Sequence, residues 1–193
     1  MDYALYSIIN GIAGKSIVLD KAMVVIAQYS QYLFGVILVL FWFRKDVKEK
    51  VMANRKAAII SVLNMLIALG VNQLIGLVYF RPRPYTLHPA HLLISPSTDP
   101  SFPSDHAAFA FALTFPVLLV NKKIGWIMTI MSGLLVFSRV FVGIHYPFDV
   151  IGGSIIAYIT YKITHKYPKY FDLTASFITK VWNTIIDKYF NAL

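Results

Sequence analysis

The chain lacks cysteine altogether and has few charged residues, which make up 14% of its 193 residues. Without thiols no disulfide framework can hold a small secreted module together, and the chain is compatible with either redox compartment. An ordinary soluble domain carries about 25% charged residues, whereas 58% of this chain is hydrophobic, which also excludes intrinsic disorder. At roughly 150 residues per domain, the length indicates one domain over residues 1–193. The scarcity of charge and the high hydrophobic content indicate that this domain is embedded in a membrane.

Five apolar stretches are candidates for membrane-spanning helices. Two of them, 22–43 and 57–80, lack Asp, Glu, Lys and Arg, and each exceeds the roughly 20 residues that cross a hydrocarbon core. The other three, 107–120, 124–144 and 150–163, are shorter or interrupted. Polar residues can extend these three if they line a cavity rather than face lipid. The sequence therefore predicts an all-α fold, a polytopic bundle of five transmembrane helices, or six if the N-terminal segment also spans.

Basic residues predict the orientation, because Lys and Arg are enriched in cytoplasmic loops. Placing the Lys- and Arg-rich linker 44–56 inside puts 13 of the 18 basic residues inside and five outside, with the N-terminus outside. We expect an outer-surface segment at 1–21, with an amphipathic helix at 3–12, and a transmembrane core at 22–170. The apolar spacing in 171–193 predicts an amphipathic helix on the inner surface.

Ionisable residues collect in the two outer loops, and at a membrane edge such residues indicate function. The first loop, 81–105, is longer than an ordinary connection, and the second loop follows the fourth span. On the predicted topology both loops lie at the same membrane face. The residues gathered there are Arg81, Arg83, Ser104, Asp105, His106, Ser138, Arg139, His145 and Asp149.

Structural roles are the alternative for several of these residues. Arg81 and Arg83 could anchor a helix end at the interface, and Ser104 and Asp149 suit the N-caps of the third and fifth spans. A capping role is compatible with chemistry. Arg139 interrupts an otherwise apolar span and therefore needs an anionic partner.

Together the residues have the chemical logic of phosphoryl transfer. Arginines bind phosphate oxygens in bidentate fashion, and a serine at a helix N-terminus adds further donors. His106 and His145 permit a displacement in which one attacks phosphorus and the other protonates the departing oxygen. Asp149, four residues after His145, can hold one ring nitrogen and leave the other free. Carboxylates are few, and His88 and His91 lack the partners of a zinc site, so no metal or other cofactor is expected.

The order and spacing of these residues resemble the type 2 phosphatidic acid phosphatase superfamily. The third signature of that family matches Ser138-Arg139, five residues, His145, three residues, Asp149. The second matches Pro103-Ser104-x-His106, and the end of the first matches Arg83-Pro84.

The resemblance implies a helical bundle over 1–193 that forms a single integral-membrane phosphatase domain. It also implies that His145 forms a phosphohistidine, that Asp149 orients it, and that His106 is first general acid and then base. Arg83, Ser104 and Arg139 would bind the phosphoryl group.

Two positions depart from the family pattern. The first signature begins with a lysine seven residues before its Arg-Pro, and Gly76 stands at that position here. Arg81 is the nearest cation to substitute for it, as a further substrate-binding residue. The second signature commonly has glycine where this chain has Asp105. The strings 102–106 and 79–84 look most like the BcrC-type undecaprenyl-diphosphatases of the bacitracin-resistance branch.

The resemblance implies hydrolysis of undecaprenyl diphosphate to undecaprenyl phosphate at the outer face of a bacterial plasma membrane. This reaction recycles a cell-wall lipid carrier and would confer bacitracin resistance. The alternative enzyme is a phosphatidic acid or phosphatidylglycerophosphate phosphatase. A lipid carrier or flippase is disfavoured, because it would need charges but not the pairing of His145 with Asp149. The soluble haloperoxidases of the superfamily are excluded, because they lack five hydrophobic spans. The expected partners are a polyprenyl diphosphate and bilayer lipids, with no nucleic acid.

Overall fold

The computed structural model describes residues 1–190, with side chains through residue 185, and this part of the chain contains no β-strand. The all-α fold predicted from the sequence is confirmed. The described residues form eight helices: α1 (Asp2–Asn10), α2 (Ile17–Trp42), α3 (Lys48–Val78), α4 (Pro84–Leu87), α5 (Asp105–Val120), α6 (Lys122–Phe141), α7 (Pro147–Lys166) and α8 (Pro168–Phe190).

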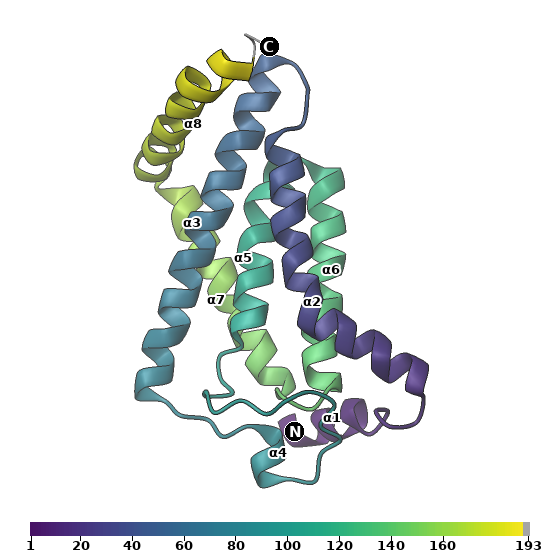
Figure 1. Cartoon of the computed structure of the whole chain (residues 1–193). Helices are drawn as coiled ribbons and strands as arrows, with labels where there is room; N and C mark the ends of the chain where they lie inside the picture. The colour runs from purple at the N-terminus through teal and green to yellow at the C-terminus, as the bar shows by residue number, and fades with distance from the viewer. Residues whose placement is uncertain (191–193) are drawn as a thin grey trace.

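Helices α2, α3, α5, α6 and α7 run alongside one another as a bundle, and α5 contacts each of the other four (Figure 1). The central position of α5 follows from its small side chains, because alanines allow neighbouring backbones to approach closely. The buried alanines of α5 are Ala107, Ala108, Ala110 and Ala112. The helix that carries His106 is therefore packed against all four other helices of the bundle.

Helices α5 and α6 form a tight antiparallel hairpin. Asn121 connects the two helices, and its side chain caps the first turn of α6. A Cβ atom at Gly125 would lie 2.2 Å from the Cα atom of Leu118, so only glycine allows this approach. Thr114 and Ser132, both buried, share a hydrogen bond of 3.1 Å across the hairpin. These contacts fix the register of α5 against α6.

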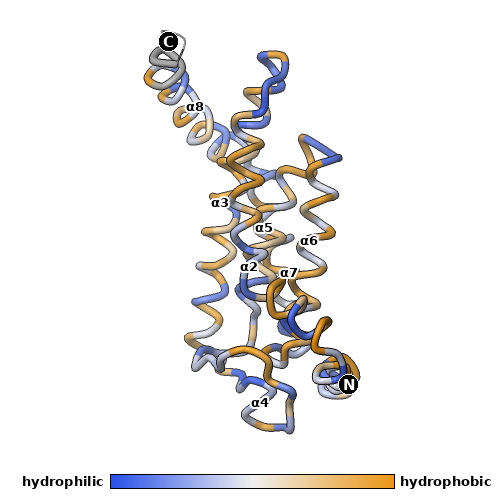
Figure 2. The backbone as a smooth tube through the Cα atoms, turned by 45° about the vertical axis from the view of Figure 1, so that its right-hand side comes forward, coloured by the Kyte–Doolittle hydropathy of each residue, from blue (hydrophilic) through white to orange (hydrophobic). Residues whose placement is uncertain are grey.

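Large apolar side chains cover the outside of the bundle, which is the surface expected of a protein surrounded by lipid. Leu40, Leu77 and Ile130 are examples, with exposed fractions of 66%, 83% and 63%. Figure 2 shows apolar residues along the middle of the bundle and hydrophilic residues towards its ends. Among the described helices, α2, α3 and α6 are long and apolar enough to cross a membrane, and α5 is apolar but has 16 residues. The count of five spans stays a prediction.

The N-terminal segment forms α1, which lies across one end of the bundle against α6 and α7 (Figure 1). The helix expected at 3–12 is thus found at Asp2–Asn10. Nine residues span only about 13 Å, so α1 is not the sixth span that the sequence left open. Helix α2 then begins at Ile17, inside the segment expected to lie on the surface, because Ser16 accepts a hydrogen bond from the backbone N–H of Leu19.

Helix α8 lies at the opposite end of the bundle and packs on α3 and α7 (Figure 1). It corresponds to the amphipathic helix expected at 171–193 but begins earlier, at Pro168. Residues 191–193 of that expected segment lie outside the described residues.

Candidate active site

Two loops at the α1 end of the bundle bring the site together. One loop joins α4 to α5, and the other, residues 142–146, joins α6 to α7. Gly143 in the second loop has a φ of 91°, and a Cβ atom there would lie 2.8 Å from the carbonyl oxygen of His91. Ser104 at the end of the first loop donates its backbone N–H to the carbonyl of Asp149 at 3.0 Å. The loops are thereby locked to each other before either contacts a ligand.

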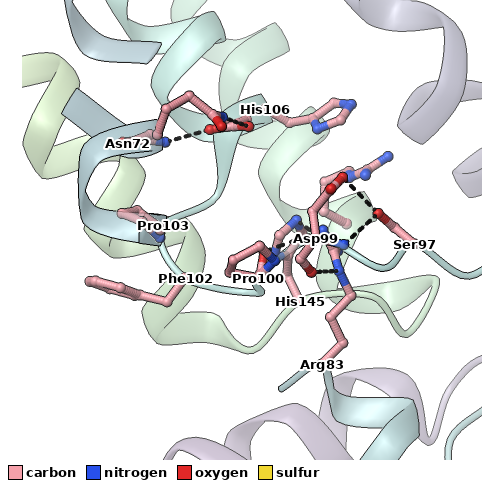
Figure 3. A pocket seen from close by; sticks show the side chains of 13 residues that line it. Asn72, Arg83, Ser97, Asp99, Pro100, Phe102, Pro103, His106 and His145 are labelled. Carbon is pink, nitrogen blue, oxygen red and sulfur yellow. Dashed lines mark hydrogen bonds between the residues drawn. The ribbon is translucent and has the colours of Figure 1, made fainter. Parts of the chain in front are cut away.

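A cavity of about 260 Å³ opens between these loops and the ends of α3, α5 and α6 (Figure 3). Four of the residues predicted to act in phosphoryl transfer line it together: Arg83, His106, Arg139 and His145. Residues far apart in the sequence thus meet at one place, as the predicted topology requires. The polar lining also includes Asn72, Gln73, Ser97, Asp99 and Asp105.

His145 is held in one orientation with one ring nitrogen available to the cavity. Its Nδ1 lies 2.9 Å from the carbonyl oxygen of Ser101, which can only accept, so Nδ1 carries the proton. The Nε2 atom is therefore unprotonated, and it lies 3.5 Å from Nη1 of Arg83. Burial lowers the pKa of His145, a loop residue outside the helices, from 6.5 to about 4. A neutral imidazole with a free Nε2 is the form required of a nucleophile.

Asp149 lies beside His145, as expected of a carboxylate that orients it, but a direct hydrogen bond between the two stays a prediction. The Oδ2 atom of Asp149 lies 3.6 Å from Nδ1 of His145, beyond hydrogen-bond distance. It accepts instead from the Ser101 hydroxyl at 2.5 Å and from the backbone N–H of Tyr146 at 2.7 Å. The N-cap of α7 is Tyr146, and Asp149 sits at the third helical position, so the expectation that Asp149 is the N-cap residue is corrected. Asp149 organises the groups that surround the histidine.

Arg83 and Arg139 are held by neutral groups and carry their charge into the cavity. Arg83 donates to the carbonyl oxygens of Asp99 at 2.9 Å and Ile144 at 3.1 Å. Arg139 donates to the carbonyl oxygen of Ala27 at 3.1 Å, and its Nε atom is buried without a hydrogen-bond partner. Both side chains are 8% exposed. Two buried guanidinium groups whose partners are carbonyl oxygens and, for Arg83, the neutral imidazole of His145 create a positive site for an anion.

His106 and Ser104 lie at the start of α5. His106 is the second residue of the helix and borders the cavity from the side opposite the loops (Figure 3). Ser104 is the N-cap residue, as expected, but its side chain makes no capping hydrogen bond, and its hydroxyl is buried without a partner. The hydroxyl therefore retains its hydrogen-bonding capacity, but Ser104 is not among the residues that line the cavity.

Arg81 is not among the residues that line the cavity. Its guanidinium group forms salt bridges with Asp2 and Asp149, both at 2.6 Å. This position does not support the expectation that Arg81 replaces the signature lysine in binding substrate. Gly76, which stands at the lysine position, does border the cavity. An ideal Cβ atom at Gly76 would meet only Cγ of Pro100, at 3.6 Å, so the position has room for a side chain.

Sequence reasoning missed the polar pair Asn72 and Gln73, whose amides donate to Asp105 at 2.9 Å and 3.1 Å. The signal was present, because two adjacent amides interrupt the apolar run of α3 one turn before Gly76. It also missed Ser101, whose carbonyl oxygen is the partner of His145. A backbone acceptor has no signature in the residue type.

A second opening reaches two of the same side chains from the side of α2. Its volume is about 360 Å³, and His106 and Arg139 line both this opening and the cavity. Gln28 and Gln31, polar residues in an otherwise apolar span, lie along it. The neighbouring Tyr32 is exposed on the outer surface of α2. The site is therefore reached both from the end of the bundle and from its lipid-facing side.

No group of three or more His, Cys, Asp or Glu side chains is placed to hold a metal ion in the part of the chain that the structure describes. The cavity lining includes the carboxylates of Asp99 and Asp105, and the amides of Asn72 and Gln73 donate to Asp105; the hydrogen-bond donors beside His145 are the guanidinium groups of Arg83 and Arg139. This chemistry suits an oxyanion.

The fold and the site define a class of protein, a membrane-embedded helical bundle with a neutral histidine beside a pair of arginines suited to an oxyanion. The comparisons agree with this class, because the family profile of the PAP2 superfamily matches residues 57–172. The chain belongs to the PAP2 superfamily. It is 34% identical to the undecaprenyl-diphosphatase BcrC of Bacillus subtilis, over 97% of this chain and 95% of that protein.

Two solved structures resemble the fold. LpxE of Aquifex aeolicus has a TM-score of 0.59 and 28% identity, covering 86% of this chain and 95% of its own. A transmembrane PAP2-type phosphatidylglycerolphosphate phosphatase of Bacillus subtilis has a TM-score of 0.63, covering 87% and 84%. At 19% identity, the second likeness concerns the fold alone. With these relatives and its apolar surface, the chain is a multi-pass membrane protein.

Proposed function

We propose that this protein hydrolyses undecaprenyl diphosphate to undecaprenyl phosphate and inorganic phosphate. The observation that carries the proposal is the unprotonated Nε2 of His145, which lies 3.5 Å from Nη1 of Arg83 in the cavity that Arg83 and Arg139 line. A nucleophile beside cations suits phosphoryl transfer, whereas a lipid carrier needs only the cations. Similarity to BcrC of Bacillus subtilis over nearly the whole chain supports a polyprenyl diphosphate as the substrate.

In the first step His145 Nε2 attacks the terminal phosphorus. A P–N bond forms, and the bond between that phosphorus and the bridging oxygen breaks. The electron pair stays on the bridging oxygen, which takes a proton from His106 acting as general acid; this role requires His106 to be protonated in the substrate complex, where the anionic phosphates favour its charged form. Arg83 and Arg139 stabilise the equatorial oxygens, with the Ser104 hydroxyl as an additional donor. The lipid monophosphate then leaves.

In the second step His106, now neutral, accepts a proton from water as the oxygen attacks the phosphohistidine. An O–P bond forms and the P–N bond breaks, returning the electron pair to Nε2 of His145. Ser101 holds the Nδ1 proton in place during both steps, because its carbonyl oxygen lies 2.9 Å away. Inorganic phosphate departs, and both histidines recover their starting protonation states.

The second opening provides a path for the lipid. In an in-line displacement the leaving oxygen lies opposite the nucleophile, hence on the side of His106. The opening beside α2 begins at His106 and Arg139 and passes Gln28 and Gln31. These amides can donate hydrogen bonds to the phosphate that stays on the lipid, while the isoprenoid chain lies against the apolar face of α2.

Phosphate release from the purified protein tests the reaction. We expect undecaprenyl diphosphate to be hydrolysed with a higher kcat/KM than phosphatidic acid or phosphatidylglycerophosphate, which are substrates of the alternative enzymes. A higher kcat/KM on either phospholipid would contradict the proposed substrate. Because bacitracin sequesters the same diphosphate, overexpression in a bacterium should raise the bacitracin concentration that it tolerates.

We further propose that the cavity faces the outside of a bacterial plasma membrane, on the basis of the imbalance of basic residues. Thr98 is exposed beside the cavity, and Lys50 is exposed at the first turn of α3, at the other end of the bundle. The native chain has no cysteine, so Thr98→Cys and Lys50→Cys each introduce one thiol. In intact cells an impermeant maleimide should label Thr98→Cys alone; labelling of Lys50→Cys alone would reverse the orientation.

A further inference from the structure

A continuous chain of charged side chains connects the N-terminal helix to Asp149. Nη2 of Arg81 donates to Asp2 at 2.6 Å, and Nη1 donates to Asp149 at 2.6 Å. Each of these nitrogens serves a different carboxylate, so Arg81 bridges α1 and α7. The ring of Tyr146 lies against the guanidinium group, with Cζ of Arg81 4.3 Å from the ring centroid. These contacts hold the Arg81 side chain in one position.

The docking of α1 is specific rather than a loose association with the bundle surface. The Asn10 amide donates to the carbonyl oxygens of His91 at 2.9 Å and Phe141 at 2.8 Å, and it is buried. At the other end of α1, Asp2 accepts from the backbone N–H of Phe148 at 3.0 Å. The helix is thus fastened at both ends to the loops that carry the site.

Asp149 depends on this arrangement because its side chain is fully buried. A buried carboxylate is costly unless it is paired and hydrogen-bonded. Arg81 supplies the permanent positive charge, while Ser101 and Tyr146 supply neutral donors. Although burial disfavours the charge of Arg81, its hydrogen bond to Asp2 and the charge of Asp149 raise the pKa of Arg81 above its ordinary value.

Asp149 acts on His145 through Ser101 as well as by its direct proximity, with Oδ2 3.6 Å from Nδ1 of the imidazole. The Ser101 hydroxyl donates to Asp149, and the Ser101 carbonyl oxygen binds Nδ1 of His145. The backbone N–H of Ser101 also donates to the carbonyl oxygen of Arg81 at 2.8 Å. Ser101 is therefore fixed between Arg81 and Asp149, and it in turn fixes the ring of His145.

We propose that Asp2 and Arg81 are positioning residues, which act through Asp149 and Ser101 to orient His145 for attack, and that Arg81 does not bind substrate. This proposal rests on the assignment of His145 as the nucleophile in the proposed function. It gives α1 a part in catalysis, because Asp2 is the residue through which that helix reaches the site.

Two other roles for Arg81 make different predictions. If Arg81 bound the diphosphate, removing its side chain would raise KM, and KM would rise more for a diphosphate than for a monoester. If Arg81 only anchored a helix end at the interface, Lys would replace it without effect. A positioning residue changes kcat with little change in KM, and a lysine, with one ammonium group, cannot present two separate nitrogens to two carboxylates.

The test compares steady-state kinetics of Asp2→Asn, Arg81→Gln, Arg81→Lys and the double variant Asp2→Asn/Arg81→Gln. Undecaprenyl diphosphate and phosphatidic acid are the substrates. We expect Arg81→Gln to lower kcat on the order of 10- to 100-fold on whichever substrate the wild type hydrolyses, since misplaced groups cost about this much. KM should change little. Asp2→Asn should lower kcat by a smaller factor and should add nothing in the Arg81→Gln background, because it acts through Arg81.

Asp20→Asn is the matched control, since Asp20 bonds the backbone of Gly14 and does not contact Arg81. If thermal unfolding shows that Arg81→Gln does not fold, the proposal is tested by comparing the kcat of Asp2→Asn with that of Asp20→Asn. A lower kcat for Asp2→Asn supports the positioning role. A rise in KM without a fall in kcat, a wild-type kcat in Arg81→Lys, or equal kcat values for Asp2→Asn and Asp20→Asn would overturn the proposal. If the wild type hydrolyses phosphatidic acid but not undecaprenyl diphosphate, the proposed substrate is refuted but the positioning role is not. The kinetics of the variants are then compared on phosphatidic acid.

Discussion

The arginines on the two sides of His145 differ in how their charge is balanced. On the cavity side, Arg83 and Arg139 bind carbonyl oxygens, whereas behind the histidine Arg81 binds two carboxylates. A guanidinium group held by neutral dipoles keeps its charge for a ligand, and one already paired with two anions does not. The comparison separates arginines that bind an anion from one that supports the fold of the site, although Arg81 and Arg83 are only two residues apart.

The largest effect should come from the histidines that face the cavity. We expect His145→Ala and His106→Ala each to lower kcat by at least 10²–10⁴-fold, the range typical of general acid–base catalysis. His165→Ala, on α7 and stacked on Tyr161, is the control for losing an imidazole elsewhere. Phosphate release and thermal unfolding should be measured on all three variants. Near-normal turnover of His145→Ala in a folded protein would refute the phosphohistidine mechanism.

The next effect concerns the two classes of arginine. Arg83→Gln and Arg139→Gln should each lower kcat/KM by about tenfold to over a hundredfold, because a charge-assisted hydrogen bond contributes about 1.5–3 kcal/mol. Competition by inorganic phosphate should weaken in both variants, since the anion loses a cationic partner. Arg81→Gln should leave the inhibition constant of phosphate unchanged. If phosphate binding weakens equally in all three variants, the distinction between the two sides of His145 is wrong.

The pH dependence should reveal how strongly the site keeps His145 neutral. Its pKa is lowered to about 4 by burial, so the acid limb of kcat/KM should fall well below the ordinary value near 6.5. At pH 5.5 an unshifted histidine would be about tenfold depleted in its neutral form, whereas His145 should stay neutral. An acid limb near pH 6.5 would contradict this.

The same shift affects stability. Between pH 6.5 and 4 the unfolded chain binds a proton at this position that the folded protein excludes, so the free energy of unfolding falls as the pH is lowered. This contribution is fully present above pH 6.5. His145→Gln, which cannot titrate, should show a shallower loss of thermal stability over this range.

The smallest effect should appear at the opening beside α2. Gln28→Leu and Gln31→Leu should each lower kcat/KM for undecaprenyl diphosphate by about 2- to 10-fold, since neutral hydrogen bonds contribute about 0.5–1.5 kcal/mol. Phosphatidic acid, whose leaving group carries no phosphate, should be affected less. Val25→Leu, an exposed change on the same helix, controls for altered lipid contact. Equal losses on both lipids would remove the second opening from the path of the leaving group.

Signature spacing predicted that Arg83, His106, Arg139 and His145 meet, because the two loops lie at one end of a bundle whose helices are marked by apolar runs. The proximity of Asp149 to His145 was predicted, whereas the hydrogen-bond acceptor of His145 and the partners of Arg81 were not predictable. The acceptor for His145 is a backbone carbonyl, and Asp2 contacts the first turn of α7 across 146 residues of sequence. Such long-range polar contacts depend on how α1 docks, which no local pattern specifies.

Helix boundaries were predicted less well than helix positions. The basic linker expected at 44–56 is largely part of α3, which begins at Lys48. Lys, Arg, Glu and Ala are good helix formers, so the helix continues through residues that a search for apolar runs excludes. Lys21 lies inside α2 for the same reason, and Asp20 lies in the first turn of α2, where a negative charge is favoured by the helix dipole.

The tight hairpin of α5 and α6 also fixes how far His106 and Arg139 lie from the turn at Asn121. His106 lies 15 residues before Asn121 and Arg139 lies 18 residues after it, so the two arms measure about 22 Å and about 27 Å along their axes. With the register fixed at Gly125 and Leu118, inserting one residue into either arm would displace one of the two side chains by about 1.5 Å and turn it by about 100°. The number of residues in each arm is therefore constrained by the chemistry at its far end, and homologous arms should vary in composition far more readily than in length.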